Sequence, residues 1–441
     1  MKVNPLYTMI VVLVTCCVLT AAPATAAKGD SNIPNSVRWL LTDVGQLIDQ
    51  KAYDQAVEKL LTFQAKGGPS QTGGSRATDI HHHPMVYFAL GNCRLLMEQY
   101  GPAEKAFQEV IRQQPDNAAA HLNLAKSYYE HELYVKAAQE FKTAYIVSPE
   151  KTPDTLYYSA AAYLMAQDYK MAIAAFEQLM TAHPDRMKPA WKSNWAHALI
   201  NDGQSRRALP YIVELIDLCT GDQRTRWQEI LVHQYLQLKM EDKARAYAEQ
   251  LTREAPAESR WWKLLSQIRL YSGDYKDALA AMTIYGYLKP LTLVEKKVWA
   301  DLNLHLGIPA QAAPVYTDLV ADARDSGMIK KLVSAFRQLG RPADALPHLE
   351  KWAQLKDDAE LMMLRADLYY EMKQYKDAAT AYRQAAQTDT PNRGKAWLMA
   401  GYAAWQDKDI APSRQAFQRA AKFKKQRKTA LAAIRQLEAL N

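Results

Sequence analysis

Hydrophobic and polar positions follow a helical period along almost the whole chain, and one combination of residues returns about every 34 positions. A clear copy is Ala103, Phe107, Val110 and Pro115, in which an alanine is followed by an aromatic residue, an apolar residue and a proline. Apolar residues at these spacings share one face of a helix, and a proline beyond them ends that helix. The pattern therefore predicts a series of similar helices, each packed through one small and one large residue.

The leading small residue of this combination keeps one register through the chain. It falls at eleven positions, ten of them alanine: Ala56, Ala103, Ala137, Ala172, Ala208, Ala244, Ala278, Ala312, Ala345, Ala378 and Ser413. The combination resembles the second helix of a tetratricopeptide repeat (TPR), an antiparallel helix pair that stacks on its neighbours. The resemblance implies an all-α, right-handed TPR solenoid of about eleven helix-turn-helix units with a C-terminal capping helix. The alternative interpretation is a generic helical bundle whose alanines share a register by chance.

Three prolines depart from the repeat pattern. Pro210, Pro314 and Pro347 each lie two residues after a lead alanine, inside the expected second helix. A proline is tolerated in the first turn of a helix, where the backbone N–H groups have no partner within the helix. These positions predict that the three second helices begin late.

The first 26 residues have the features of a cleavable export signal. Lys2 precedes an apolar stretch at 9–19, and Ala24-Thr25-Ala26 fits a cleavage site for small residues. This arrangement predicts a periplasmic protein. The alternatives are an uncleaved segment that anchors the chain to the membrane, and lipidation at Cys16.

The repeat register divides the rest of the chain into four segments. The first hairpin and the residues before it occupy 27–63, a flexible insert rich in glycine, serine and histidine occupies 64–83, the TPR array occupies 84–425, and a basic capping helix occupies 426–441. The insert accounts for the one long step in the register, and its composition is typical of loops.

Three consecutive histidines at the end of the insert raise the question of a metal site. His81, His82 and His83 are adjacent, so their side chains cannot all face one ion from a helix. A polar loop end is the favoured interpretation, with the histidines kept as metal-site candidates. No cofactor is expected.

The charge of the chain is unevenly distributed. The net charge is +8, and residues 413–437 contain eight lysines and arginines without one acidic residue. A polar outer face suits a terminal capping helix, and such a surface also suits weak contact with membrane headgroups. Specific binding of nucleic acid is not expected from a nearly balanced chain with an export signal.

Motifs of catalysis do not stand out. No phosphate-binding glycine loop, nucleophile elbow or paired-cysteine motif occurs, and His131-Glu132 lacks the second histidine of the common metalloprotease helix. The sequence therefore predicts a non-catalytic protein. A TPR-bearing hydrolase would need a domain outside the repeats, and the repeats use nearly all of 37–440.

The first helices of TPR units line the concave face in the proteins that this chain resembles, and register transfers those places here. Units two to four offer an apolar trough that includes Phe88, Tyr129 and Tyr157. This trough is either ordinary core or a site for a peptide or amphipathic helix.

Units seven to nine offer a more polar surface at the same register. Lysine occupies the fifth place of the repeat three times, at Lys263, Lys297 and Lys330, and the accompanying residues are Gln267, Tyr271, Asp301, His305 and Arg337. This lysine ladder resembles the carboxylate clamp of some TPR domains, although the expected asparagine is absent. It predicts binding of a carboxylate-bearing segment or, alternatively, solvated surface charges.

Residues 260–441 also resemble a narrower group, exported TPR proteins that accompany TonB, ExbB and ExbD in proteobacteria. The motifs that carry this resemblance are 285–288, 295–299, 304–309 and 393–397. It implies a periplasmic scaffold that binds a protein or an extended peptide within a TonB-dependent transport system. An adaptor in outer-membrane, polysaccharide or cell-division machinery is the alternative.

Overall fold

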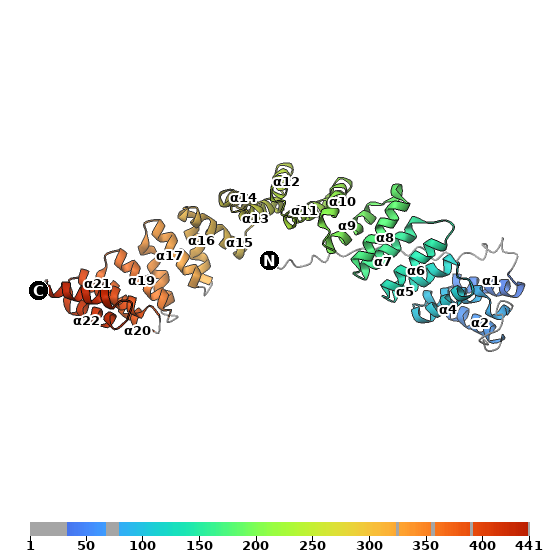
Figure 1. The fold of residues 1–441 in the computed structure, drawn as a ribbon, viewed down its shortest axis with the longest axis horizontal. Coiled ribbons are helices and arrows are strands. Elements are labelled where there is room, and N and C mark those ends of the chain that lie inside the picture. Colours follow the sequence, from blue (N-terminus) through green and yellow to red (C-terminus); the bar gives the residue numbers. More distant parts are fainter. Residues whose placement is uncertain (1–32, 68–78, 323–325, 354–357, 389–390, 440–441) are drawn as a thin grey trace. The chain divides into compact units, whose positions relative to one another are not determined.

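The computed structural model describes residues 33–67, 79–322, 326–353, 358–388 and 391–439. These residues form helices joined by short turns, and no strand occurs among them (Figure 1). The expected export signal lies outside the described residues, as does most of the glycine-rich insert. None of the described helices is long and apolar enough to cross a bilayer.

The chain divides into two compact units, residues 1–240 and 241–441. In the first unit, the first helices of the pairs are α1 (Asn35–Asp49), α3 (Pro84–Leu96), α5 (Ala118–Glu130), α7 (Pro153–Met165), α9 (Pro189–Asn201) and α11 (Gly221–Gln237). The second helices are α2 (Tyr53–Ala65), α4 (Tyr100–Gln113), α6 (Tyr134–Val147), α8 (Tyr169–Ala182) and α10 (Ser205–Leu218). Each helix from α1 to α11 packs on the next along the chain.

The second unit opens with α12 (Glu241–Glu254), which by chain order is a second helix. The first helices are α13 (Ser259–Tyr271), α15 (Leu293–His305), α17 (Ser326–Gln338), α19 (Ala359–Glu371) and α21 (Arg393–Gln406). The second helices are α14 (Tyr275–Leu288), α16 (Pro309–Asp322), α18 (Leu346–Ala353), α20 (Tyr375–Gln387) and α22 (Ile410–Ala421). The final helix α23 (Arg427–Ala439) packs on α22 through Ala430, Ala433 and Leu437.

The eleven lead residues explain why this sequence forms helix pairs. Each lies in or at the start of a second helix, and each has a relative exposure of 0%. Only a small side chain allows the helix backbones to approach this closely, and the neighbouring large residue fills the remaining volume. The all-α repeat fold is therefore confirmed at every lead position.

Glycine replaces alanine in the first helix where the facing aromatic ring is closest. A Cβ atom on Gly91 would lie 2.6 Å from Phe107, and one on Gly401 would lie 2.5 Å from Phe417. Both rings are fully buried, at 0% exposure. In these two pairs, the aromatic ring of the second helix therefore occupies the space that a side chain on the glycine would need.

The late helix starts predicted at the three prolines are wrong in two cases. Helix α10 begins at Ser205 and continues through Pro210, and α16 begins at Pro309 and continues through Pro314. Pro210 faces solvent, so the carbonyl freed by its missing N–H can bond water while Ala208 keeps the helix packed. Only Pro347 follows the prediction, because the 3₁₀ turn η5 (Pro342–Ala345) precedes α18.

The three histidines of the insert contact three different groups. They form the 3₁₀ turn η3 (Ile80–His82) and the cap of α3. His81 Nδ1 lies 2.9 Å from the carbonyl oxygen of Phe63, and His82 Nδ1 lies 2.8 Å from the hydroxyl of Tyr87. His83 Nδ1 accepts from the backbone N–H of Met85 at 3.2 Å. Within the described ranges, no cluster of three or more His, Cys, Asp or Glu could hold a metal.

Candidate functional site

The apolar trough predicted on the first unit is largely filled by its own side chains. Tyr157 on α7 is only 7% exposed, stacks on Trp191 of α9 with ring centroids 4.9 Å apart, and accepts a hydrogen bond from Asn194. Phe88 and Tyr129 are half-buried against aromatic residues of the following helices. Tyr157 is therefore core, and assigning it to a binding groove is wrong because α9 covers its ring.

Two of the three ladder lysines form ion pairs with carboxylates on the first helix of the following repeat. Lys263 Nζ on α13 lies 2.7 Å from Glu295 on α15, and Lys330 on α17 pairs with Glu360 on α19. Lys297 is half-buried between them on α15. Lys263 and Lys330 are therefore paired with counterions from the following repeat, although the side chains of both lysines remain more than 40% exposed.

Two other predicted residues are engaged in the same way. Asp301 accepts from Tyr316 at 2.5 Å and forms an ion pair with Lys331 at 2.6 Å. Arg337 pairs with Glu371 at 2.8 Å. A carboxylate ligand at this surface would have to replace ion pairs that already join the repeats.

Gln267, Tyr271 and His305 remain exposed. Tyr271 at the end of α13 is 77% exposed, and the ring of His305 packs edge-on against Tyr275, with centroids 4.7 Å apart. Of the residues predicted from units seven to nine, these three are therefore open to solvent.

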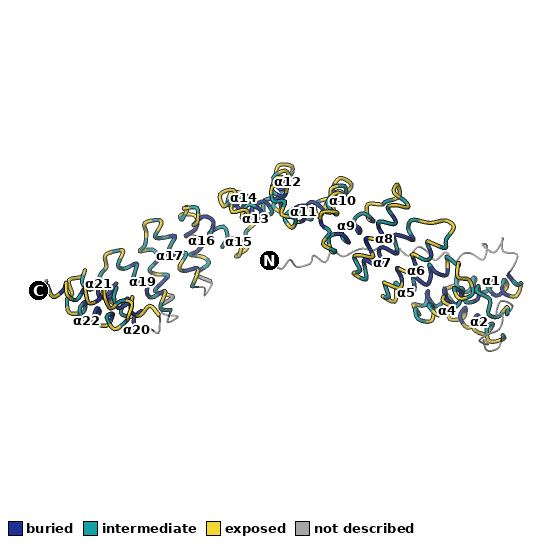
Figure 2. Tube along the Cα trace, in the orientation of Figure 1, coloured by how far each residue is buried: buried dark blue, intermediate teal, exposed yellow. Residues whose placement is uncertain are grey.

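Exposed apolar side chains are frequent on α13, α14 and the start of α15. Among the described residues, seven of seventeen exposed large apolar side chains fall within 270–294. Figure 2 marks exposed positions along the Cα trace in yellow. We call them the α13–α15 surface: Leu270, Tyr271, Tyr275, Tyr287, Leu288, Leu293 and Val294. Tyr287 is 86% exposed and Val294 is 73% exposed, so neither side chain contributes to the core of the repeats. Leu270, Tyr271 and Tyr275 lie near the start of α14, and the other four lie near its end. Exposed apolar side chains gathered on neighbouring helices are typical of protein interaction sites.

Sequence reasoning identified Tyr271 but did not select the other six residues as site residues. The available signal was the stretch 287–294, in which five of eight residues are large and apolar at a position where the repeat needs only a short turn. A helical period cannot distinguish these residues from core, because exposure depends on how closely α15 approaches α14.

A capping box begins α15 and orders the ion pair at its first turn. Glu295 accepts from the backbone N–H of Thr292 at 2.9 Å, and Thr292 Oγ1 accepts from the backbone N–H of Glu295 at 3.3 Å. Burial by itself would raise the pKa of Glu295, but the hydrogen bonds from Lys263 and Thr292 lower it to about 2. Lys263→Glu would therefore place a second carboxylate against Glu295 and disturb α15 itself.

Replacing Glu295 by glutamine should destabilise the second unit by about 1 kcal/mol at pH 7, since its ion pair is partly in water. The folded-state pKa is lower than the unfolded value, so this contribution is complete above about pH 4.5 and is lost as the pH falls towards 2. Urea unfolding of both proteins at a series of pH values measures the difference. Glu258→Gln, which removes an exposed pair with Arg260, is the control and should show no such trend. A difference that stays constant down to pH 3 would contradict the assignment.

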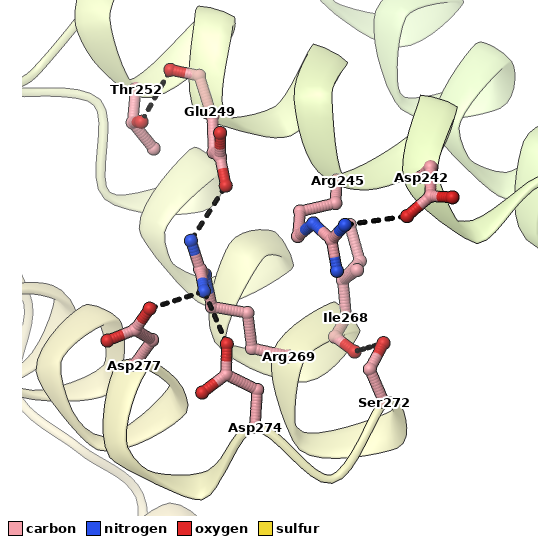
Figure 3. A network of polar contacts seen from close by, with 9 residues as sticks. All are labelled: Asp242, Arg245, Glu249, Thr252, Ile268, Arg269, Ser272, Asp274 and Asp277. Carbon is pink, nitrogen blue, oxygen red and sulfur yellow. Dashed lines mark hydrogen bonds and ion pairs between the residues drawn. The ribbon is translucent and has the colours of Figure 1, made fainter.

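One arginine connects α13 with the helices on either side of it (Figure 3). Arg269 donates to Glu249 of α12 at 2.7 Å and to Asp274 and Asp277 at the start of α14, both at 2.6 Å. Its side chain is only 16% exposed. A single cation, one residue before Leu270, thus balances three carboxylates. These contacts fix the orientation of α13 between α12 and α14.

Known proteins support the repeat assignment. Sequence models described as tetratricopeptide repeat match residues 88–155, 363–428 and 154–186. No curated protein matches the sequence of this chain.

Solved structures with similar folds are distant in sequence. The Naa15/Naa10 complex bound to HypK-THB is 13% identical, with a TM-score of 0.42 over 86% of this chain, which spans only 62% of that one. A tetratricopeptide repeat protein from Parabacteroides merdae is 14% identical, with a TM-score of 0.32, covering 69% of this chain and 100% of that chain. YrrB, described as a TPR protein with an unusual peptide-binding site, is 18% identical, with a TM-score of 0.33, covering 44% and 96%.

The helix pairs, their buried lead residues and the repeat matches together define the fold as an all-α tetratricopeptide repeat solenoid. Stacked repeats of this kind present extended binding surfaces, so the fold indicates a scaffold for protein–protein interaction.

Proposed function

We propose that this protein is a non-catalytic scaffold that binds a protein or an extended peptide on the α13–α15 surface. The observation that carries the proposal is the concentration of exposed apolar side chains there, while the lead residues of every repeat are fully buried. Packing of the repeats is thus complete without Tyr271 and Val294, so their exposure is better explained by contact with a partner.

The chemistry of the surface favours a partner segment with both apolar and acidic residues. Tyrosines at 271, 275 and 287 supply large rings that lose little side-chain entropy on binding. Lys263 lies over the ring of Tyr285, near the end of α14 that carries Tyr287, and its side chain is 45% exposed in its ion pair with Glu295. A partner carboxylate could share this ammonium group, because Glu295 would keep its hydrogen bond from the backbone N–H of Thr292.

The proposal extends to the cell compartment in which the scaffold acts and to the transport system that it serves. The scaffold acts in the periplasm after cleavage near Ala27, as an accessory of a TonB-dependent transport system, and its partner is a TonB, ExbB or ExbD component. Residues 2–26 support export, and the motifs within 260–441 support the TonB association. The exposed Tyr287 and Leu288 belong to one of those motifs.

Site-specific crosslinking of the full chain in its native cells tests the proposal. A photoreactive amino acid at Tyr271 or at Val294 should yield a discrete covalent complex, whose partner and compartment are then identified by mass spectrometry and fractionation. Ile146 and Leu218, which are 55% and 53% exposed on second helices of the first unit, are the matched controls.

Complexes that form equally well at the control positions would contradict a site on α13–α15. For the partner so identified, Tyr271→Ser with Val294→Ser should weaken binding by about tenfold or more, because exposed tyrosines at interfaces often dominate the affinity. Ile146→Ser with Leu218→Ser should leave the calorimetric affinity unchanged. A cytoplasmic partner would remove the TonB assignment but leave the scaffold function intact.

A further inference from the structure

Eight exposed cations gather at one end of the final helices, on elements separate from the α13–α15 surface. Five of the seven residues at 422–428 are lysine or arginine. We call the whole group the basic end: Arg393, Lys395, Arg419, Lys422, Lys424, Lys425, Arg427 and Lys428.

Tertiary contacts, not sequence proximity, bring Arg393 and Lys395 into this group. They flank Gly394 in the first turn of α21, and a Cβ atom on Gly394 would lie 2.8 Å from Phe423 in the turn between α22 and α23. The antiparallel arrangement of α21 and α22 also places Arg419 over the ring of Trp397, 4.4 Å from its centroid. The start of α21, the end of α22 and the start of α23 therefore share one end of the stack.

Carboxylates of the described residues do not neutralise this end. No ion pair in the described part of the chain involves any of the eight cations, and the sequence has no acidic residue between Asp409 and Glu438. Helices α21 and α23 have no acidic residue in their first turns, where acidic residues would complement the helix dipole. Cations at these helix starts oppose the helix dipole, so helix stability does not explain the charge of this surface.

The side chains indicate which kind of anion the surface suits. Arg427 is engaged with the carbonyl oxygen of Ala421 and Arg393 with that of Ala386, so the charges that remain most open are lysines. Lysine attracts anions as a point charge and lacks the planar fork that reads nucleobases. Two aromatic residues lie at this end. Trp397 is covered by Arg419, and Phe423 is half-buried against Gly394, so neither offers an open platform for stacking a base.

One apolar residue completes the outward face of α23. Leu431 is 46% exposed and lies within one helical turn of Arg427, Lys428 and Arg435. A leucine among cations on an exposed helix is the composition of segments that rest on lipid headgroups. Clusters of four to eight lysines and arginines are likewise typical of surfaces that bind anionic lipid.

We propose that the basic end docks on the anionic surface of a lipid bilayer and holds the last helices against the membrane. The proposal does not depend on the function of the α13–α15 surface, since the two surfaces share no residue. It gives the scaffold a second attachment that acts through charge.

Vesicle sedimentation of the full chain tests this proposal. The probe is a vesicle of 30% phosphatidylglycerol in phosphatidylcholine, compared with one of pure phosphatidylcholine, at 0.1 and 0.5 M NaCl. The intact protein should bind the anionic vesicle at 0.1 M NaCl, and binding should fall steeply at 0.5 M. The triple variant Lys422→Glu, Lys424→Glu, Lys425→Glu should lose on the order of 100-fold in partition coefficient, from about fivefold for each lysine near a membrane.

The matched control reverses three lysines elsewhere in the same unit. Lys243→Glu, Lys276→Glu and Lys376→Glu lie on exposed faces of α12, α14 and α20 and change the net charge equally. Binding by this control within about threefold of the intact protein supports a localised surface. The apolar stretch at 9–19 is present in all three proteins, so its own membrane affinity cancels in the comparison.

Three outcomes would overturn the proposal. The first is equal loss in both triple variants, which would show a response to net charge alone. The second is binding that persists unchanged in the Lys422 variant. The third is preferential binding of a 20-base-pair DNA duplex over the anionic vesicle at the same salt concentration, which would identify a nucleic-acid surface instead. Circular dichroism with a melting curve verifies that each variant is folded.

Discussion

Replacing Gly91 by alanine should destabilise the first unit by about 2 kcal/mol. The new Cβ would lie 2.6 to 2.9 Å from three atoms of the Phe107 ring, which is fully buried and cannot move into solvent. Overpacking of this kind typically costs about 1–3 kcal/mol and outweighs the roughly 1 kcal/mol that alanine gains over glycine in a helix. Urea unfolding followed by circular dichroism measures the loss, and hydrogen exchange should localise it to α3 and α4.

Gly45 is the matched control for this substitution. It lies inside α1, and a Cβ atom added there would have nothing within 4 Å, so Gly45→Ala should stabilise the protein by about 0.5–1 kcal/mol. Phe107→Leu should rescue Gly91→Ala, and the two substitutions together should cost less than the sum of their separate effects by at least about 1 kcal/mol. Simple additivity would mean that Gly91 and Phe107 do not pack as described.

Replacing Arg269 by methionine should destabilise the second unit by about 2–3 kcal/mol. Methionine keeps the apolar stem but leaves Glu249, Asp274 and Asp277 without the cation that balances them (Figure 3). Removing one partner of a largely buried ion pair typically costs about 3–5 kcal/mol, and the partial exposure of these carboxylates reduces that loss. Chemical denaturation monitored by circular dichroism gives the magnitude.

Arg245 on α12 provides the control within the same network. Its partner Asp242 has a side chain 92% exposed, so Arg245→Met should change the free energy of unfolding by less than about 0.5 kcal/mol. A loss equal to that of the control would show that Arg269 acts only as surface charge.

The register of alanines determined most of the fold before any contact was known. A small residue such as Ala312 or Ala345 is needed wherever two helices of a pair touch, so its spacing directly reports the length of the structural repeat. The prolines were less informative. Pro210 and Pro314 lie inside helices because tertiary packing outweighs a local preference, and no single-sequence rule contains that balance.

The candidate site could be predicted only as far as its helices. Register placed Lys263 and Tyr271 correctly on α13, because position within a repeat selects a face. It could not show that Glu295 pairs with Lys263 or that α9 covers Tyr157. Both contacts come from the following repeat, because Glu295 lies 32 positions after Lys263 and Trp191 on α9 lies 34 positions after Tyr157.

By itself, the sequence determined the class of fold, the number of helix pairs described and the identity of the residues that bury them, because these follow from a period that is local to each repeat. Only the tertiary structure decided which lysines are paired, which apolar residues of α13–α15 stay exposed, and that Arg393 joins the cations of the last turn. Pairing and exposure depend on the distance between successive helices, and that distance is set by the packing of side chains from different repeats.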